Sequence, residues 1–256
     1  MWLSRTTLLV GEDNVQKLKN AHVLVVGLGG VGSFAAEFIC RAGVGTMTIV
    51  DGDVVDPSNR NRQLQALSST HGQSKAELMA TRLMDINPEL KLHVRKDFLS
   101  PALAEEICDF PYDYVVDAID SLTPKLYLIT AAHNKGLRVI SSMGAGGKLD
   151  PMRIKVAVLK ETRICHFALM VRKRLKSPEI RSNLKTVFSD EPAVKESLMM
   201  TDGSNYKKSA YGTMSYLPAA FGGACASVVI RDLLGEGIEM YRYEVGNRRR
   251  AVSNRQ

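Results

Sequence analysis

The first residues whose types and spacing could support chemistry are three glycines. Gly27, Gly29 and Gly32 form a G-x-G-x-x-G turn between an apolar run and a helical pattern, and Asp51 follows the next apolar run. Glycines let the backbone approach phosphates closely, and the amino terminus of a helix favours negative charge. A carboxylate at the position of Asp51 can accept hydrogen bonds from ribose hydroxyls. The pattern predicts a nucleotide site and, taken alone, is typical of an NAD site.

The segment after Asp51 carries more charge than NAD requires. Arg62 and Lys75 are cations that could neutralise the three phosphates of ATP, and Asn59 and Gln63 are neutral donors close to them in the sequence. A phosphate that is attacked becomes more anionic in the transition state, and such donors stabilise it. Lys75 also begins a predicted helix, so its amine and the helix amino terminus could face the same anion. These residues favour ATP and adenylation over NAD.

Two carboxylates follow a later apolar run, in the sequence VVDAIDS. Asp117 and Asp120 are predicted to lie at the end of a parallel strand, which is where ligands bind in an open α/β sheet. A carboxylate at that edge can hold the Mg²⁺ that accompanies ATP. Asp120 is therefore the candidate metal ligand.

The elements that would position these residues follow from periodicity. Short apolar runs alternate with helical patterns over residues 1–142, which predicts a parallel sheet built from β-α-β units. The expected strands are 22–27, 46–51, 90–96, 112–118 and 137–142, and the expected helices are 32–43, 75–85, 101–108 and 123–135. Beyond them we expect an antiparallel strand at 153–159, a basic helix near 164–176, a long mobile loop at 189–213 and a final helix at 214–235. The fold class is α/β: a Rossmann-like, mostly parallel sheet with helices on both faces, extended by antiparallel strands in the second half.

Composition limits the class of protein further. The 256 residues are 45% hydrophobic, enough for a substantial core, and no linker separates the nucleotide-binding half 1–142 from the half at 143–256. We therefore expect one domain, 1–256. Four scattered cysteines without a C-x-x-C pair argue against structural zinc and fit a reducing compartment. Uninterrupted apolar runs are short and no signal-peptide pattern begins the chain, so we expect a cytoplasmic protein without a membrane segment.

Positive charge is concentrated in the second half. The net charge is +7, and residues 148–187 contain eleven Lys and Arg but three Asp and Glu. The sequence NRRRAVSNR near the end of the chain adds a second basic run. A localised excess of cations fits a polyphosphate partner such as RNA, and an ordinary solvated face is the alternative.

The motifs resemble a known family. VVGLGGVGS, DGDVVDPSNRNRQ, GQSKAE and VVDAIDS are similar to the adenylation domain of ubiquitin-activating enzymes and their bacterial relatives of the ThiF, HesA and MoeB type. The resemblance covers about residues 5–142, with one departure at Ser74, where proline usually precedes the lysine. It implies ATP as cofactor, bound with Mg²⁺ on Asp120, and an ATP site made by Gly27, Gly29, Gly30, Gly32, Asp51, Asp53, Ser58, Asn59, Arg60, Asn61, Arg62, Gln63, Lys75, Asp120 and Ser121.

The same resemblance assigns roles and an assembly. It implies that Arg62, Lys75 and Asp120 are catalytic in a homodimer, and that Arg5 reaches across to the γ-phosphate of the ATP in the partner. The second half, with SSMGAGGKLDP, RICHFALMVRKRLK and MSYLPAAFGGACASVVIRDLLG, is similar to the tRNA threonylcarbamoyladenosine dehydratases. That branch acts on a modified adenosine in tRNA, through an acyl-adenylate of the threonyl carboxylate that an internal oxygen then captures. The tRNA-binding residues are then expected to be Arg172, Lys173, Arg174 and Lys176.

The sequence leaves two other functional hypotheses open. Relatives that activate a ubiquitin-like sulfur-carrier protein share the nucleotide half, but they usually carry two C-x-x-C pairs or a positioned acceptor cysteine, and this chain has neither pattern. Cys165 and Cys225 are the only thiols of the second half. A sulfur-relay partner of the cysteine desulfurase type is a further candidate, and an NAD oxidoreductase is the remaining alternative.

Overall fold

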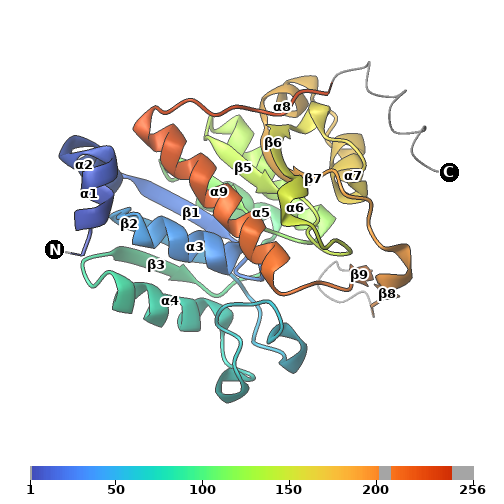
Figure 1. Cartoon of the computed structure of the whole chain (residues 1–256), viewed down its shortest axis with the longest axis horizontal. Helices are drawn as coiled ribbons and strands as arrows, with labels where there is room; N and C mark the ends of the chain where they lie inside the picture. Colours follow the sequence, from blue (N-terminus) through green and yellow to red (C-terminus); the bar gives the residue numbers. More distant parts are fainter. Residues whose placement is uncertain (1, 202–208, 244–256) are drawn as a thin grey trace.

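A computed structural model describes residues 2–201 and 209–243 of the chain. Within these residues a seven-stranded sheet forms the centre of the molecule, in the order β3-β2-β1-β4-β5-β7-β6 (Figure 1). Six neighbouring strands run parallel, and β6 closes one edge antiparallel to β7. The strands are β1 (His22–Val26), β2 (Thr46–Val50), β3 (Lys91–Arg95), β4 (Tyr114–Asp117), β5 (Val139–Ser142), β6 (Ile154–Val158) and β7 (Lys185–Ser189).

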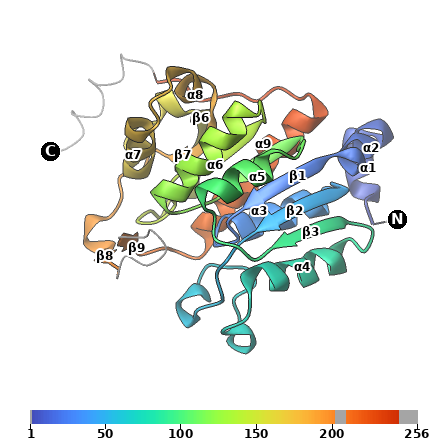
Figure 2. The same cartoon turned by 180° about the vertical axis from the view of Figure 1, so that it is seen from behind.

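Helices cover both faces of this sheet. Figure 1 shows α3 and α9 over one face, and Figure 2 shows α5 and α6 over the other. The central strands β1 and β4 are buried on both faces, which explains why HVLVV and YVVD read as continuous apolar runs rather than alternating ones. The helices are α1 (Ser4–Val10), α2 (Glu12–Asn20), α3 (Gly32–Arg41), α4 (Lys75–Ile86), α5 (Pro101–Cys108), α6 (Leu122–Asn134), α7 (His166–Arg174), α8 (Pro178–Asn183) and α9 (Tyr216–Leu234).

The second half joins the sheet of the first half. β7 pairs with β5, so Ile140 lies opposite Lys185 and Ser142 opposite Val187. The helices α6, α7 and α8 share an apolar cluster with β6 and β7 that includes Phe188 and Leu159. The antiparallel extension and the helices on both faces confirm the predicted fold class.

Three details of the sequence prediction were wrong or incomplete. The strand β7 was not predicted, because KTVFS is short and only its neighbours β5 and β6 reveal that it is buried. The segment predicted as a loop at 189–213 contains two short paired strands, β8 (Leu198–Met200) and β9 (Ser209–Tyr211), and its residues 202–208 lie outside the described part. The helices α1 and α2 were also not predicted.

The helix α9 bears on the expectation of no membrane segment. Within its nineteen residues an 18-residue stretch has a mean hydropathy of 1.4, so the helix is long and apolar enough to cross a membrane by length and composition alone. In the structure the helix packs on α3, where a Cβ on Gly222 would lie 2.6 Å from the carbonyl oxygen of Val31. Leu217, Phe221 and Val229 belong to the main apolar core. The packing gives this apolar helix a place inside the fold, as expected for a core helix.

Candidate active site

The predicted nucleotide residues converge where the strand order reverses. β1 lies between β2 and β4, and the chain leaves these neighbours toward opposite edges of the sheet. Backbone hydrogen bonds continue the ladder past the strand ends: the amide of Gly27 donates to the carbonyl of Val50 at 2.9 Å, and that of Ala118 to the carbonyl of Val26 at 2.9 Å. The glycine turn and the β4–α6 loop therefore start side by side, at the switch point where α/β folds bind ligands.

Where the backbone of the glycine turn comes closest to itself, there is no room for a side chain. Gly27 has φ of +87°, and a Cβ on Gly32 would lie 1.7 Å from the carbonyl oxygen of Gly27. Ser33 in the first turn of α3 donates its hydroxyl to the carbonyl of Gly29 at 2.7 Å. The turn is thus fixed by backbone contacts and presents the amino terminus of α3 to the site.

Asp51 and Asp53 lie beside this turn but have different partners. The amide of Leu28 donates to Oδ2 of Asp51 at 2.6 Å, and the amide of Asp53 donates to Oδ1 at 2.8 Å. Burial raises the pKa of Asp51, and the charge of Lys75 and the two amides oppose that shift. Lys75, the first residue of α4, has a buried side chain whose Nζ lies 3.1 Å from Oδ2 of Asp53. The lysine is therefore placed at the site by a carboxylate rather than left in solvent.

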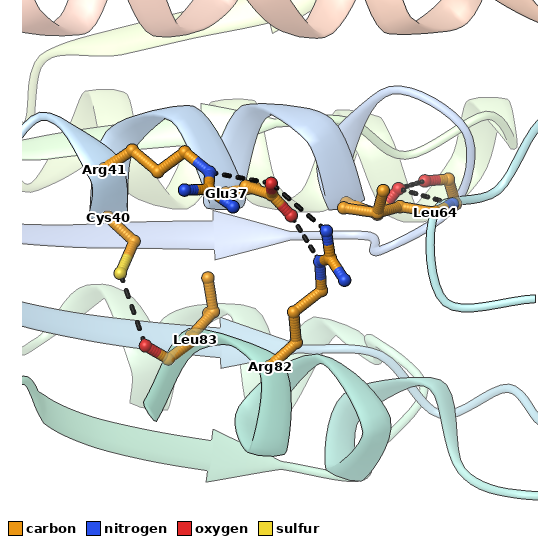
Figure 3. A network of polar contacts seen from close by, with 8 residues as sticks. Glu37, Cys40, Arg41, Leu64, Arg82 and Leu83 are labelled. Atoms are coloured by element: carbon orange, nitrogen blue, oxygen red, sulfur yellow. Dashed lines mark hydrogen bonds and ion pairs between the residues drawn. The ribbon is translucent and has the colours of Figure 1, made fainter. Parts of the chain in front are cut away.

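Figure 3 shows how α3 and α4 are held together behind the site. Glu37 on α3 accepts hydrogen bonds from Arg41 at 2.8 Å and from Arg82 on α4. Burial opposes ionisation of Glu37, but the bonds from Arg82 and Arg41 outweigh it and hold its pKa below its usual value. On the same side of α3, the amide of Leu64 lies 3.5 Å from the hydroxyl of Ser33. These contacts fix the two helices that begin with Gly32 and Lys75 at the candidate nucleotide site.

A short 3₁₀ turn shapes the segment after β2. Asp56 accepts from the amide of Ser58 at 2.8 Å, and Asn59 accepts from the amide of Asp56 at 3.2 Å. Asn59, which was predicted to line the ATP, is buried, and its side-chain oxygen caps this turn. The Nη1 of Arg62 donates to the carbonyl of Ser58 and to Oδ1 of Asn61, both at 2.8 Å. Residues of the predicted ATP-lining segment therefore form hydrogen bonds with one another, and Arg60 is exposed on this loop.

The structure brings Arg62 and Asp120 together. Burial lowers the pKa of Arg62, and the negative charges of Asp120 and Asp56 oppose that shift. Arg62 comes from the β2–α4 connection and Asp120 from the β4–α6 loop, so only the fold places them near each other. A cation and a carboxylate that could act on phosphate charge therefore lie near each other at this edge of the sheet.

Gln63 offers an unused polar atom to a ligand. Its residue is 9% exposed, and its carboxamide oxygen has no hydrogen-bond partner among the described residues. A Cβ on Gly29 would lie 3.8 Å from Nε2 of Gln63, and one on Gly30 would lie 3.2 Å from the carbonyl oxygen of Arg62. A buried polar atom without a partner is costly, so a donor from a nucleotide would improve this site.

Asp117 was a candidate carboxylate beside Asp120, and its surroundings give it a different role. It is fully buried, and its Oδ2 lies 2.7 Å from Nζ of Lys125 and accepts from the hydroxyl of Ser141 at 2.6 Å. Nζ of Lys125 also donates to the carbonyl of Ser142 at 3.0 Å. Asp117 therefore joins β4, β5 and α6 and is not open to a metal. Sequence reasoning missed Lys125, whose only signal is a lysine inside an apolar helical stretch.

The donor set near Asp120 fits a magnesium ion carried by ATP rather than a resident metal. In the described ranges, no group of three or more His, Cys, Asp or Glu side chains could hold an ion. Mg²⁺ that accompanies a nucleotide is typically bound by one or two carboxylates together with the phosphates and water. Asp120 is exposed at the site mouth, with the buried Ser121 beside it at the start of α6. The residues present fit that mode of binding.

Comparison with known proteins places this chain in a family. The model of the ThiF family matches residues 3–252. The chain belongs to the ThiF family. The tRNA threonylcarbamoyladenosine dehydratase of Bacillus subtilis is 38% identical over 246 residues, which are 93% of this chain and 96% of that protein. The enzyme of the same name from Haemophilus influenzae is 35% identical over 88% of this chain and 90% of that protein.

A solved structure agrees with these sequence relatives. The tRNA N6-threonylcarbamoyladenosine dehydratase of E. coli, TcdA, in complex with ATP, matches with a TM-score of 0.82 and 35% identity. The match covers 91% of this chain and 93% of that one. This ThiF chain is therefore similar along nearly its whole length to an ATP-binding protein.

Arg5 lies far from the nucleotide residues of its own ThiF chain. It is exposed on α1, and the neighbouring Leu3 packs on Gly43, just beyond the carboxyl end of α3. The glycine turn lies at the other end of α3, ten residues or about 15 Å away at 1.5 Å per residue. Figure 1 shows α1 and α2 at that far end of the sheet. Arg5 therefore lies at the opposite end of α3 from the glycine turn of its own chain.

The four predicted tRNA-binding residues do not share one environment. Lys173, Arg174 and Lys176 are exposed at the end of α7 and just beyond it. Arg172 is half-buried, and its Nη1 donates to the carbonyl of Thr162 and lies 3.0 Å from the hydroxyl of Thr162. The basic run at 247–255 lies outside the described residues.

Proposed function

We propose that this chain catalyses the ATP-dependent dehydration of N6-threonylcarbamoyladenosine in tRNA. The observation that carries the proposal is the match, along nearly the whole chain, to a dehydratase of that name in complex with ATP. The convergence of Arg62, Lys75 and Asp120 on the glycine turn supports the same chemistry, because adenylation needs cations and a carboxylate around the phosphates.

The proposed reaction has two steps. The threonyl carboxylate attacks the α-phosphate of ATP, which releases pyrophosphate and makes the carboxyl carbon an electrophile. The carbamoyl oxygen of the same nucleoside then attacks that carbon, releases AMP and closes a ring, with net loss of one water. Arg62, Lys75 and the amides at the start of α3 stabilise the charge on the phosphates. Since the nucleophile is on the same nucleoside, effective molarity favours ring closure without an enzyme thiol.

Mg²⁺ is proposed to enter with ATP and to be held by Asp120. The ion would neutralise phosphate charge during attack. Within this chain, the negative charge of Asp120 acts on Arg62, and Lys75 forms an ion pair with Asp53.

The tRNA and a second copy of the chain are the proposed partners. Lys173, Arg174 and Lys176 are exposed cations suited to RNA phosphates, and Arg172 lies beside them. We infer a homodimer in which Arg5 acts in trans; its support is the apolar surface of the amino-terminal segment, where Trp2 is 50%, Leu8 81% and Leu9 85% exposed. A sulfur-relay partner, a cytoplasmic location and a single domain over 1–256 remain predictions from the sequence.

Activation of a ubiquitin-like carrier is less well supported. All four cysteines, Cys40, Cys108, Cys165 and Cys225, are buried, so none offers an accessible thiol as a thioester acceptor. Burial raises the pKa of Cys225 to about 12, which keeps it in the unreactive thiol form.

The deciding experiment uses the purified chain, ATP, Mg²⁺ and tRNA that bears the open-chain nucleoside. Nucleosides from the digested tRNA are weighed by mass spectrometry, and we expect the loss of one water only when ATP is present. An unchanged nucleoside, together with ATP–pyrophosphate exchange that depends on a carrier protein ending in Gly-Gly, would replace the proposal with carrier activation.

A further inference from the structure

The fold gives the cations of the second half different surroundings. Several are neutralised within the chain: Nε of Arg153 lies 2.9 Å from Oδ1 of Asp190, and Nζ of Lys185 lies 2.5 Å from Oδ2 of Asp232. Lys148 is buried and donates to the carbonyl of Gly144 at 2.6 Å. Arg153 and Lys185 therefore contribute little free positive charge, and Lys148 is buried against a neutral carbonyl group.

A second group gathers around one hollow that the sequence did not reveal. The hollow measures about 450 Å³ and lies between α7, α8 and the 3₁₀ turn Leu159–Glu161. Its walls consist of Lys160, Leu169, Arg172, Lys173, Pro178, Arg181 and Ser182. Four of these seven residues are cationic and none is acidic. Among the described residues, none of the four forms an ion pair.

The walls of this hollow are fixed by contacts below it. Arg172 on α7 bonds Thr162, which follows the 3₁₀ turn, and the hydroxyl of Thr162 donates to the carbonyl of Leu159 at 2.8 Å. Ser177 caps α8 by accepting from the amide of Ile180 at 3.3 Å. Leu159 and Ile180 are buried in the same apolar cluster. The cations are therefore held near each other by the core rather than by carboxylates.

Holding like charges together costs free energy unless an anion binds. Burial lowers the pKa of Arg172, and the positive charge of Arg163 lowers it further. Two wall residues come from elements separate from α7: Lys160 from the 3₁₀ turn and Arg181 from α8. A phosphate fits such a site, since it accepts several charge-assisted hydrogen bonds from donors that converge on it.

We propose that this hollow is a phosphate-binding pocket that holds the backbone of the RNA substrate. The inference rests on the proposed function and adds Lys160 and Arg181 to the RNA-binding residues. α7 connects the pocket to the active-site edge: Nζ of Lys125 lies 5.7 Å from the centre of the Phe167 ring, and Arg172 follows five residues later, roughly 8 Å along the helix. One RNA molecule could then contact both the candidate active site, at the end of β4, and the pocket.

The test compares two double variants that each remove two positive charges. Lys160→Ala with Arg181→Ala changes the pocket, while Lys19→Ala with Lys91→Ala changes two exposed lysines at the far end of the sheet. Arg172 is left intact because it holds the 3₁₀ turn. Binding of tRNA is measured over a series of salt concentrations, and circular dichroism checks that both variants fold as wild type does.

We expect the pocket variant to bind tRNA about tenfold more weakly at physiological ionic strength. Its plot of log K against log salt should be less steep by about one, the value for one lost phosphate contact. The control variant should keep the wild-type slope, and Lys160→Arg with Arg181→Lys should restore most of the affinity. Equal affinities and slopes for the pocket and control variants would overturn the proposal.

A further arm separates RNA from free phosphate. If inorganic phosphate protects the wild type from thermal unfolding through Lys160 and Arg181 while the tRNA slope is the same in both variants, the pocket serves a small anion and the RNA assignment is wrong. Dehydration of modified tRNA by the wild type is scored separately. Failure there with a pocket-dependent tRNA slope refutes the proposed function alone, and the reverse result refutes the pocket alone.

Discussion

The substitution Lys125→Met tests whether the buried ion pair beside the active site determines the stability of the β4–α6 loop. Lys125 and Asp117 are both 0% exposed, and Nζ of Lys125 also donates to the hydroxyl of Ser141 at 3.2 Å and to the carbonyl of Ser142. Methionine has a similar length and no charge. The variant would leave the carboxylate of Asp117 buried without a cation.

The expected cost follows from that burial. Removing one partner of a buried pair typically costs about 3–5 kcal/mol, because the remaining charge has lost its partner and has no water. A domain near this size shifts its Tm by about 2–4 °C per kcal/mol, so we expect Tm to fall by roughly 6–20 °C. Replacing both partners, with Asp117→Asn added to Lys125→Met, removes the stranded charge and should recover much of the loss.

Urea unfolding and differential scanning calorimetry of the apo protein would measure both effects. The matched control is Lys96→Met, which breaks a pair with Glu77 at 2.6 Å whose side chains are 58% and 59% exposed. An exposed pair contributes about 0–1 kcal/mol. A Lys125→Met variant as stable as the Lys96→Met control would refute the argument, and so would a double variant less stable than the single one.

Three further outcomes are expected. Arg62→Ala and Asp120→Ala should each abolish water loss from the nucleoside while the Tm stays within a few degrees of wild type; dehydration at the wild-type rate in either variant would contradict their roles. The depressed pKa of Glu37 means that its extra stability is complete above its unfolded pKa of about 4.3 and disappears as pH falls through the lower folded value. Glu37→Gln should therefore flatten the acid limb of the stability curve, and parallel limbs would count against this. Burial raises the pKa of Cys40 to about 11 and that of Cys225 to about 12, so a thiol reagent at pH 8 should label them only on the timescale of unfolding, whereas rapid labelling of the folded chain would show that they are accessible.

Local pattern was sufficient for most of the first half. The apolar run His22–Val26, the glycine turn and the helix from Gly32 follow one another within twenty residues, so sequence spacing already contains their geometry. The strand Lys185–Ser189 was not predictable in the same way. Its burial comes from β5 and β6, which are distant in sequence, and five residues carry too little periodicity to distinguish a strand from a loop.

The charged residues show the same division more sharply. The types and spacing of the glycines, Asp51, Arg62, Lys75 and Asp120 predicted a nucleotide site and favoured adenylation as its chemistry. The sequence could not show that Asp117 forms a buried ion pair with Lys125, or that Asp53 positions Lys75. Those assignments depend on which side chains meet across strands and helices.

The sequence by itself determined the fold class, the nucleotide turn and the excess of positive charge after residue 147. Only the tertiary structure decided how that charge is used. It pairs Arg153 and Lys185 with carboxylates distant in sequence, and it collects Lys160 and Arg181 around one hollow, where neither forms an ion pair with a residue that the structure describes. The physical reason is that the sequence gives the number of charged side chains. Whether each charge is neutralised depends on the distances between side chains, which only the packing of the fold determines.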